Sequence, residues 1–310
     1  MPRFSIIITC HNHYAYIRDA VGSALAQDYT DKEIIVVDDE STDGSKEILE
    51  EFGDSIKLIR LETNEGASAA RNRGASLASG DFLVSLDGDD LMLPWALDVY
   101  HRIIDLKDPK LILCKMLYFT NTLSSVNIGN NPPEVRVVDY EAFMKKDRAY
   151  AASASAMVIE RQSFHNVGGF SKEAWPIDDE DLVLKLGYSG RTIQIVQPPT
   201  TAYRIHSNNF SHQITHLIDG VHELIRREKL GKYPGGRTCR SERYVVIGGI
   251  VFYWVRRSFR EGLYREWLKL LAVGWPMAMI AIFRRCLVVL RGRRPEETLT
   301  IEMPVQVRTA

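Results

Sequence analysis

An acidic cluster follows an apolar segment near the middle of the N-terminal half. The apolar run 82–86 leads directly into Asp87, Gly88, Asp89 and Asp90. If strand geometry persists to its end, Asp87 and Asp89 lie on one side, because side chains two residues apart in a strand share a face. Neighbouring carboxylates repel each other unless a cation lies between them, and such oxygen ligands suit Mg²⁺ or Mn²⁺. The pattern predicts a metal site for a phosphate-containing substrate; a turn is the structural alternative.

A second acidic cluster, residues 178–181, is expected to begin a helix that extends to about residue 189. Acidic side chains at a helix N-terminus are favoured by the helix dipole, which is the structural interpretation. Asp179 is followed at the third, fourth and seventh positions by apolar residues, which places it on the inward face. Asp181 precedes Lys185 by four residues and fits an exposed ion pair. Because an inward carboxylate requires a partner or a function, Asp179 is the candidate general base.

Three other segments each have a functional and a structural interpretation. Asp38 and Asp39 end an expected strand, and Asp39 is placed to accept a hydrogen bond from a nucleobase imide or to cap the following turn. Residues 64–74 begin a helix whose N-terminus and Arg71 suit a diphosphate, although a capped surface helix has the same pattern. His206 is either a third metal ligand or a structural histidine.

Alternating strand and helix patterns would place these residues together. Such alternation predicts an α/β fold with a mostly parallel, doubly wound sheet, in which ligands bind at the carboxyl ends of the strands. Thr9, Asp38, Asp39 and the cluster after residue 86 all lie at such ends. Further strands are expected at 111–119 and 156–160. The first four strands are expected at 4–9, 33–38, 56–61 and 82–86, and the helices between and after them at 14–26, 45–52, 66–78 and 94–106.

Composition limits the class of protein. The 310 residues carry a net charge of −1 and are 45% hydrophobic, which suits one large or two smaller globular domains without a general attraction to nucleic acid. The four cysteines are far apart in sequence, so reduced thiols in the cytoplasm are expected, and no signal peptide is predicted. Dinucleotide-binding, P-loop and α/β-hydrolase motifs do not occur, which disfavours those enzyme classes.

The C-terminal region has a different character. Ten Lys and Arg residues lie between residues 254 and 294, against Glu261 and Glu266. Two uncharged apolar stretches, 244–255 and 270–283, are shorter than the roughly 20 residues of a membrane-spanning helix. Basic residues mixed with aromatic ones beside short apolar stretches suit amphipathic helices lying in a membrane interface. The alternative is a helical pair that packs on the domain or mediates oligomerisation.

Taken together, the segment from about residue 4 to 211 resembles the family 2 glycosyltransferases of the GT-A fold. Two departures from the family pattern stand out: the pair at 178–179 reads Asp-Asp where Glu-Asp is usual, which leaves Asp181 as a rival base, and the Gln-x-x-Arg-Trp motif of processive synthases does not occur. The matching motifs, in order, are Ser5 to Asn12, Val37 to Gly44, Asn64 to Gly74, Asp87-Gly88-Asp89, Asp178-Asp179 and Tyr203 to His206.

The resemblance implies an inverting, metal-dependent transfer of a sugar from a nucleotide-diphosphate sugar, UDP-linked by expectation. The acceptor would be a hydroxyl of a glycan or polyprenyl-linked molecule in cell-surface polysaccharide synthesis. Mn²⁺ or Mg²⁺ would bind Asp89, with Asp87 and His206 as further ligands, and Asp179 would be the base. The nucleotide-binding residues implied by the family motifs are Thr9, His11, Asn12, Asp38, Asp39, Gly66, Arg71 and Asp87.

The expected organisation has three parts. Residues 1–211 would form the catalytic domain, with a nucleotide-sugar half at 1–110 and an acceptor half at 111–211. Residues 212–294 would form a helical region that associates with membrane or packs on the domain, and 295–310 a polar tail. The expected location is the cytoplasm, peripheral on the cytoplasmic face of the inner membrane. Two alternatives stay open: a sugar-phosphate nucleotidyltransferase, and a non-catalytic binding or scaffold protein with a transferase-like fold.

Overall fold

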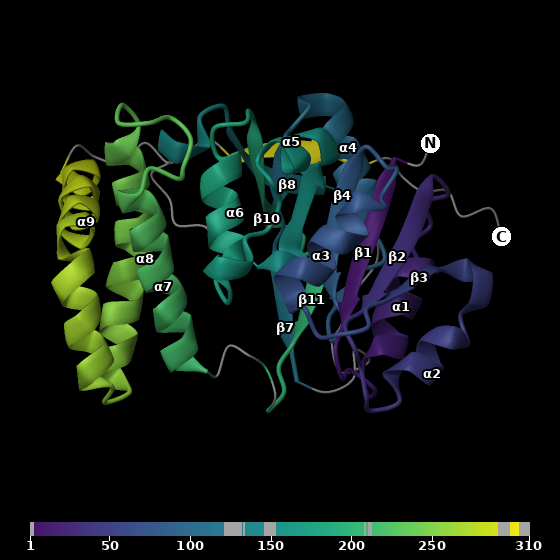
Figure 1. Ribbon diagram of the computed structural model, residues 1–310. Helices are drawn as coiled ribbons and strands as arrows, with labels where there is room; N and C mark the ends of the chain where they lie inside the picture. Colours follow the sequence, from purple (N-terminus) through teal and green to yellow (C-terminus); the bar gives the residue numbers. More distant parts are fainter. Residues whose placement is uncertain are drawn as a thin grey trace.

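The computed structural model describes residues 3–120, 132, 134–145, 153–207, 209, 213–290 and 298–303. Within these residues the strands form a nine-stranded sheet of order β12-β8-β10-β6-β9-β4-β1-β2-β3 and a three-stranded sheet of order β5-β11-β7. Helices cover both faces of the large sheet, and three long helices stand at one side of the molecule (Figure 1). The predicted α/β class is therefore confirmed.

The N-terminal half contains the parallel part of the large sheet. All seven residues of β1 are buried, as expected for a parallel strand covered on both faces. β1 pairs in parallel with β2 and β4, and Thr9 lies opposite both Val37 and Asp87. The carboxyl ends of three strands are therefore level. The strands here are β1 (Phe4–Cys10), β2 (Lys32–Asp38), β3 (Lys57–Arg60) and β4 (Phe82–Asp87), and the helices are α1 (Ile17–Leu25), α2 (Ser45–Glu50), α3 (Ala67–Ser76) and α4 (Ala96–Lys107).

The second half extends the sheet with mixed pairing. β9 runs antiparallel to both β4 and β6, and β10 is antiparallel to β8. The expected strand 111–119 is two strands, β6 in the large sheet and β7 in the small one. The elements are β6 (Leu111–Leu113), β7 (Met116–Phe119), β8 (Glu134–Tyr140), β9 (Met157–Glu160), β10 (Thr192–Gln197), β11 (Thr201–Arg204), β5 (Leu91–Met92), α5 (Arg161–Asn166) and α6 (Asp178–Leu186), with single 3₁₀ turns at Gly53–Ser55, Phe143–Lys145, Ala154–Ala156 and Lys172–Ala174.

Two buried clusters occupy the two faces of the sheet. Alternate residues of β1 separate between them: Phe4, Ile6 and Ile8 pack with α1 and α4, whereas Ile7 packs on the face that α6 covers. This alternation is the period-2 pattern of a strand buried on both sides. The second cluster continues outward from α6 into the C-terminal helices, so those helices share a core with the large sheet.

The C-terminal region is a bundle of α7 (Ile214–Lys229), α8 (Arg240–Arg260) and α9 (Tyr264–Leu290), which stand beside one another beyond α6 (Figure 1). α8 and α9 approach closely, because a Cβ built on Gly248 would lie 2.0 Å from the Met277 carbonyl oxygen. α9 is continuous through Pro276. Although the uncharged stretches are short, Tyr264–Leu287 within α9 is long and apolar enough, by length and composition alone, to cross a membrane.

The chain returns to the large sheet after α9. Residues Thr298–Glu302 form β12, which pairs antiparallel with β8 along Glu134–Val138. The segment predicted as a polar tail thus contains an edge strand. Its sequence, Thr-Leu-Thr-Ile-Glu, alternates polar and apolar residues, and Ile301 is buried against the sheet.

Candidate active site

A buried arginine joins the elements that carry the two acidic clusters. Arg71, on α3, is 5% exposed; its Nη2 lies 2.7 Å from Asp87 Oδ1 and its Nη1 lies 3.3 Å from Asp178 Oδ2. The Ser68 hydroxyl also donates to Asp178 Oδ2, at 2.6 Å. The end of β4 is therefore tied through α3 to the first residue of α6. The arginine predicted to bind a diphosphate has both terminal nitrogens engaged by carboxylates in this arrangement.

The two carboxylates on Arg71 respond differently to their surroundings. Burial alone would raise the pKa of Asp87. The positive charge of Arg71, its hydrogen bond to Asp87 and a hydrogen bond with Ser155 together hold that pKa below its usual value. For Asp178 burial is the stronger effect, so its pKa is raised although Arg71 and Ser68 oppose the shift. Asp87 is therefore the carboxylate that most favours the charged form beside the guanidinium.

The metal-site prediction assumed that strand geometry continued to Asp89, and this assumption is wrong. β4 ends at Asp87. The chain then turns, with the Gly88 N–H donating to the Thr9 carbonyl at 2.8 Å. A Cβ on Gly88 would meet that carbonyl oxygen at 2.8 Å and His13 Nδ1 at 2.7 Å, so the close approach requires glycine. Asp87 contacts Arg71, and Asp89 takes a different partner.

That partner is His206, beyond the end of β11. Its Nε2 lies 3.0 Å from Asp89 Oδ2, and its ring stacks on Tyr16 at 4.7 Å between centroids. The predicted metal ligands Asp89 and His206 are thus brought together, whereas Asp87 is joined to Arg71. No cluster of three or more His, Cys, Asp or Glu side chains placed to hold a metal occurs in the described parts of the chain. An oxygen and a nitrogen ligand nevertheless fit a divalent ion that completes its coordination with substrate phosphates and water.

Residues beside this pair orient it. Arg204 Nε donates to the Asp89 carbonyl at 3.0 Å, and its backbone N–H donates to Asp90 Oδ1 at 2.9 Å. Asp90 is almost fully buried, and burial together with the charges of Asp89 and Asp87 raises its pKa well above the usual value. The Arg204 guanidinium lies over the rings of Tyr16 and Phe119. Asp90 is therefore a buried support of the turn.

The loops after β1 and β2 form the predicted nucleotide-binding edge. Asp39 accepts backbone N–H groups at the start of α3, from Glu65 at 2.8 Å and Gly66 at 2.9 Å. These two hydrogen bonds are the ones expected if Asp39 caps the turn that follows it. That Asp39 also accepts a hydrogen bond from a nucleobase stays a prediction. His11 Nδ1 lies 2.6 Å from the Asp39 carbonyl oxygen. Asn12 Oδ1 accepts the Thr42 N–H at 2.8 Å.

Two residues on this edge have left-handed backbone conformations, Asn12 with φ 57° and Glu40 with φ 61°. Such conformations are uncommon outside glycine and cluster at functional sites. Asp38 is fully buried below them, with Oδ1 accepting the Ser41 N–H at 3.3 Å. The β1 and β2 loops are therefore held together by side-chain bonds to backbone, which leaves a defined edge for a nucleotide.

The start of α6 separates the two candidate bases. Asp179 is half-buried, and burial, followed by the nearby charges of Glu180 and Asp178, raises its pKa well above the usual value. Asp181 has no exposed surface: Arg227 Nε and Lys185 Nζ lie 2.8 and 3.2 Å from its oxygens. The hydroxyls of Ser171 and Tyr233 donate to it as well.

The prediction that Asp181 and Lys185 form an exposed pair is therefore wrong, because α7 and the segment after it cover this face of α6. The partners of Asp181 make it a structural ion-pair centre, and Asp179 is the more accessible carboxylate. Sequence reasoning missed Ser155, whose hydroxyl accepts the Asp87 N–H at 2.8 Å, and Ser68. No local pattern singles out either serine, since both contacts join segments far apart in sequence.

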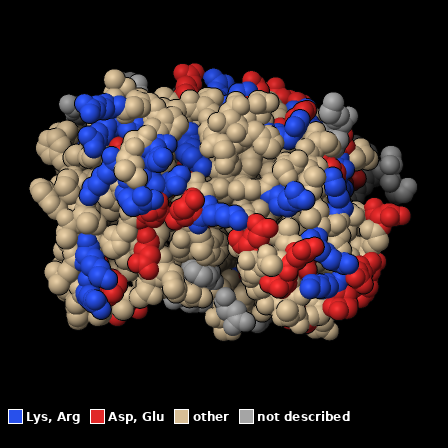
Figure 2. All heavy atoms as spheres, in the orientation of Figure 1, with Lys and Arg blue, Asp and Glu red and all other residues tan. Residues whose placement is uncertain are grey.

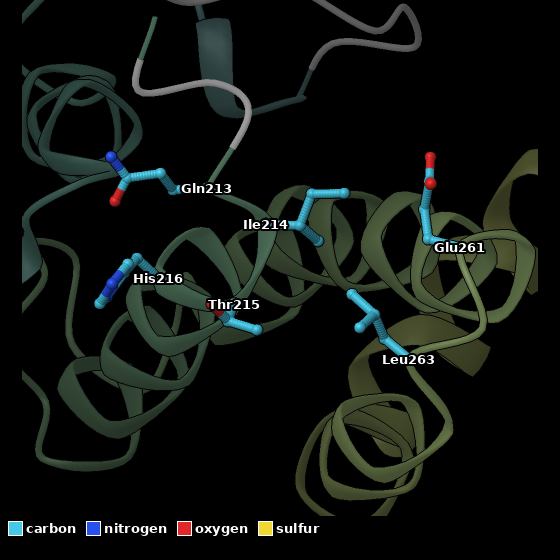
Figure 3. A pocket seen from close by; sticks show the side chains of 6 residues that line it. All are labelled: Gln213, Ile214, Thr215, His216, Glu261 and Leu263. Atoms are coloured by element: carbon cyan, nitrogen blue, oxygen red, sulfur yellow. The ribbon is translucent and has the colours of Figure 1, made fainter. Parts of the chain in front are cut away.

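A hollow of about 450 Å³ lies elsewhere, between the start of α7 and the α8–α9 turn. Gln213, just before α7, and His216, on α7, line it, together with Glu261 and Leu263 from the turn (Figure 3). None of the predicted site residues lines it.

Comparison with known proteins shows similarity to a glycosyltransferase family. The model of glycosyl transferase family 2 matches residues 5–123, which include both loops of the nucleotide edge and the Asp87-to-Asp89 turn. Residues 5–123 thus match glycosyltransferase family 2, and the comparisons together support a family 2 glycosyltransferase. The glucosyltransferase WfaP of Escherichia coli is a relative, 29% identical over 244 residues, with 76% of this chain and 88% of WfaP covered. Alignments with the first two curated relatives cover 65% and 38% of those proteins.

Solved structures support the GT-A fold of this chain. S. aureus TarS 1-349 in complex with UDP-GlcNAc has a TM-score of 0.64 and 15% identity, covering 99% of this chain and 98% of that one. The mannosyltransferase PcManGT from Pyrobaculum calidifontis, in complex with GDP-Man and Mn²⁺, has a TM-score of 0.55 and 18% identity, covering 92% and 87%. At these identities the likeness shows the fold alone.

Proposed function

We propose that this family 2 glycosyltransferase transfers a sugar, with inversion, from a nucleotide-diphosphate sugar to an acceptor hydroxyl. The proposed donor is a UDP-sugar, and the proposed acceptor is a glycan or a polyprenyl-linked molecule in cell-surface polysaccharide synthesis. The observation that carries the proposal is the Arg71 bridge, because it places the start of α6, with Asp179, beside the carboxyl end of β4. WfaP, named for transfer from UDP-Glc to a diphosphoundecaprenol-linked sugar, supports the donor and acceptor classes.

The proposed base is Asp179. Its raised pKa gives it greater proton affinity than an ordinary carboxylate, so it accepts the proton of an acceptor hydroxyl more readily. As the proton moves to Asp179, the hydroxyl oxygen bonds to the anomeric carbon. The bond from that carbon to the diphosphate oxygen breaks, and the nucleoside diphosphate leaves. A single displacement from the opposite face inverts the configuration.

Asp89 and His206 would hold Mn²⁺ or Mg²⁺, and a bound divalent ion neutralises charge on a leaving diphosphate. The nucleotide would lie along the edge formed by the β1 and β2 loops, near Thr9, His11 and Asp39. Gly66 lies at the start of α3, whose N-terminus favours negative charge and so supports the diphosphate.

The test is a panel of nucleotide sugars with Mn²⁺ or Mg²⁺, with release of nucleoside diphosphate as the readout. We expect turnover with at least one UDP-sugar, and Asp179→Asn should lower kcat by about 10²–10⁴, the range for a general base, while donor affinity changes little. Asp54→Asn, at an exposed carboxylate in a 3₁₀ turn, is the matched control. Full turnover in the Asp179 variant would refute the base assignment. Pyrophosphate release from a nucleoside triphosphate and a sugar phosphate would instead favour the nucleotidyltransferase alternative.

If the acceptor is linked to a lipid carrier, the protein must work at the membrane that holds this carrier. We infer that the protein works in the cytoplasm, peripherally on the cytoplasmic face of the inner membrane, with residues 244–294 as the membrane-associated region. The apolar length of α9 supports this placement. Cell fractionation tests it, with recovery in the soluble fraction alone as the contrary result.

A further inference from the structure

The outward face of α9 carries an exposed row of uncharged side chains. Successive members are three or four residues apart, so they share one side of the helix. The row from Tyr264 to Phe283 extends about 28 Å at 1.5 Å per residue. Its opposite side, including Leu270, Met277 and Ala281, is buried. We call this row the α9 stripe; it comprises Tyr264, Leu268, Ala272, Trp275, Met279, Phe283 and Cys286.

The stripe is exposed to an unusual degree for apolar side chains. Trp275, Leu268 and Phe283 are 58%, 59% and 65% exposed. On α8, Tyr253 and Phe259 are also more than half exposed, and Phe259 contacts the ring of Tyr264 at the beginning of the stripe. Contiguous apolar surface of this kind marks an interaction site in a soluble protein.

Positive charge lies at both ends of the stripe. Arg260, Arg265 and Lys269 are exposed near the α8–α9 turn, and Arg284 and Arg285 lie near the other end. Figure 2 shows Lys and Arg side chains in the upper and in the lower part of the helical side, at the left of the view. The basic residues predicted from sequence are thus arranged around an apolar centre.

We propose that the α9 stripe lies flat on an anionic lipid bilayer, with its apolar side chains in the interface and its terminal arginines on lipid phosphates. The inference rests on the peripheral location in the proposed function and identifies the contacting face. Tryptophan and tyrosine favour the interfacial depth, and basic residues near an anionic surface strengthen binding to it. A helix with this arrangement is typical of interfacial binding.

The connections of α9 favour lying on the bilayer over crossing it. α8 is held to α7 by the buried pair of Arg243 and Glu228, at 2.6 Å, and α9 packs tightly on α8 at Gly248. β12, which follows α9, pairs with β8 in the main sheet. Both ends of α9 are therefore tied to the same globular body, whereas a crossing helix would carry one end to the far side of the membrane.

A second copy of the chain is a poorer occupant of the stripe. Because both ends are basic, parallel or antiparallel pairing of two stripes brings arginine clusters together. Like charges in contact across an interface cost several kcal/mol. Lipid phosphates complement both ends at once, which favours the bilayer.

The experiment is flotation of the full chain with vesicles of phosphatidylcholine alone or mixed with phosphatidylglycerol. We expect binding to the anionic vesicles to be at least tenfold stronger and to weaken at high salt. The double variant Trp275→Glu/Phe283→Glu should lose at least tenfold in binding, whereas Leu106→Glu, at a half-exposed leucine on α4, should bind as the native chain does. Arg284→Gln/Arg285→Gln, which leaves the apolar row intact, should reduce binding to anionic vesicles only.

Three results would overturn the inference: equal flotation of the native chain and the stripe variants, resistance of bound protein to alkaline carbonate extraction, which indicates a span, or a dimer in light scattering that the double variant abolishes. Nucleotide release without vesicles is measured in parallel. A native chain that turns over but does not float with anionic vesicles contradicts the inference alone. A native chain that floats but does not turn over contradicts the proposed function alone.

Discussion

At the scale of single residues, Arg71 is the side chain that joins the two acidic clusters of the candidate site. It balances the buried carboxylate of Asp178 and the partly buried carboxylate of Asp87, which lie far apart in the sequence. A buried carboxylate without a partner is costly, so the three groups depend on one another. Arg71 thus links the stability of the domain to the relative placement of β4 and α6.

Replacing Arg71 with Met should destabilise the protein by about 3–5 kcal/mol, because it leaves the buried Asp178 and the partly buried Asp87 without their cation. Urea unfolding measures the loss. Arg73→Met is the matched control, since Arg73 is exposed on the same helix. Similar losses in the two variants would show that the bridge contributes little.

The raised pKa of Asp179 predicts a pH dependence. A base works only when deprotonated, so kcat/KM should fall with decreasing pH at a midpoint above the value of about 4 usual for carboxyls. The stability effect has the opposite sense. Because the folded protein binds this proton more tightly than the unfolded chain, the charged carboxylate costs stability once the pH exceeds the unfolded pKa, and the cost vanishes below it.

Asp179→Asn removes that charge and should raise the melting temperature at neutral pH while it abolishes turnover. A pH–rate profile of the native enzyme and melting curves of both proteins at pH 7 measure the two effects. An acidic limb near pH 4 together with an unchanged melting temperature would contradict the raised pKa.

At the scale of elements, the turn after β4 decides where the acidic side chains point. The sequence identified Asp87 and Asp89 correctly as residues at a strand end, but placed them on one face. Their separation depends on the Gly88 hydrogen bond to Thr9 in a neighbouring strand, a contact 79 positions earlier in the chain. Local periodicity holds no information on such a contact.

Gly88→Ala should displace this turn, because its Cβ would lie 2.8 Å from a backbone oxygen that cannot move away freely. We expect a loss of about 1–3 kcal/mol in stability and a higher Mn²⁺ concentration for half-maximal turnover. Gly22→Ala in α1 is the control, since its Cβ meets nothing within 4 Å and alanine favours a helix. Unchanged metal dependence in Gly88→Ala would separate the turn from metal binding.

The order of elements in the parallel half could be predicted because each strand and helix there follows from a local pattern. The division of 111–119 into β6 and β7 could not, since it depends on which sheet each half joins. Likewise, Asp181 and Lys185 were paired correctly by spacing. Their burial follows from α7, which the spacing does not place.

At the scale of the whole molecule, the helical bundle is part of the same folded body as the transferase core. The second buried cluster extends from the sheet through α6 to α8 and α9. Arg227 of α7 also contacts Asp181 of α6, two residues beyond the proposed base. The lipid-facing side proposed for α9 is therefore rigidly connected to the helix that carries Asp179.

The return of the chain through β12 has a practical consequence. Removing residues from α8 onward, the simplest way to make a membrane-free enzyme, also strips the outermost strand from the large sheet and uncovers the unpaired edge of β8. An open edge invites strand addition and aggregation. A soluble version of this protein should instead keep residues 298–302 and exchange only the outward side chains of α9.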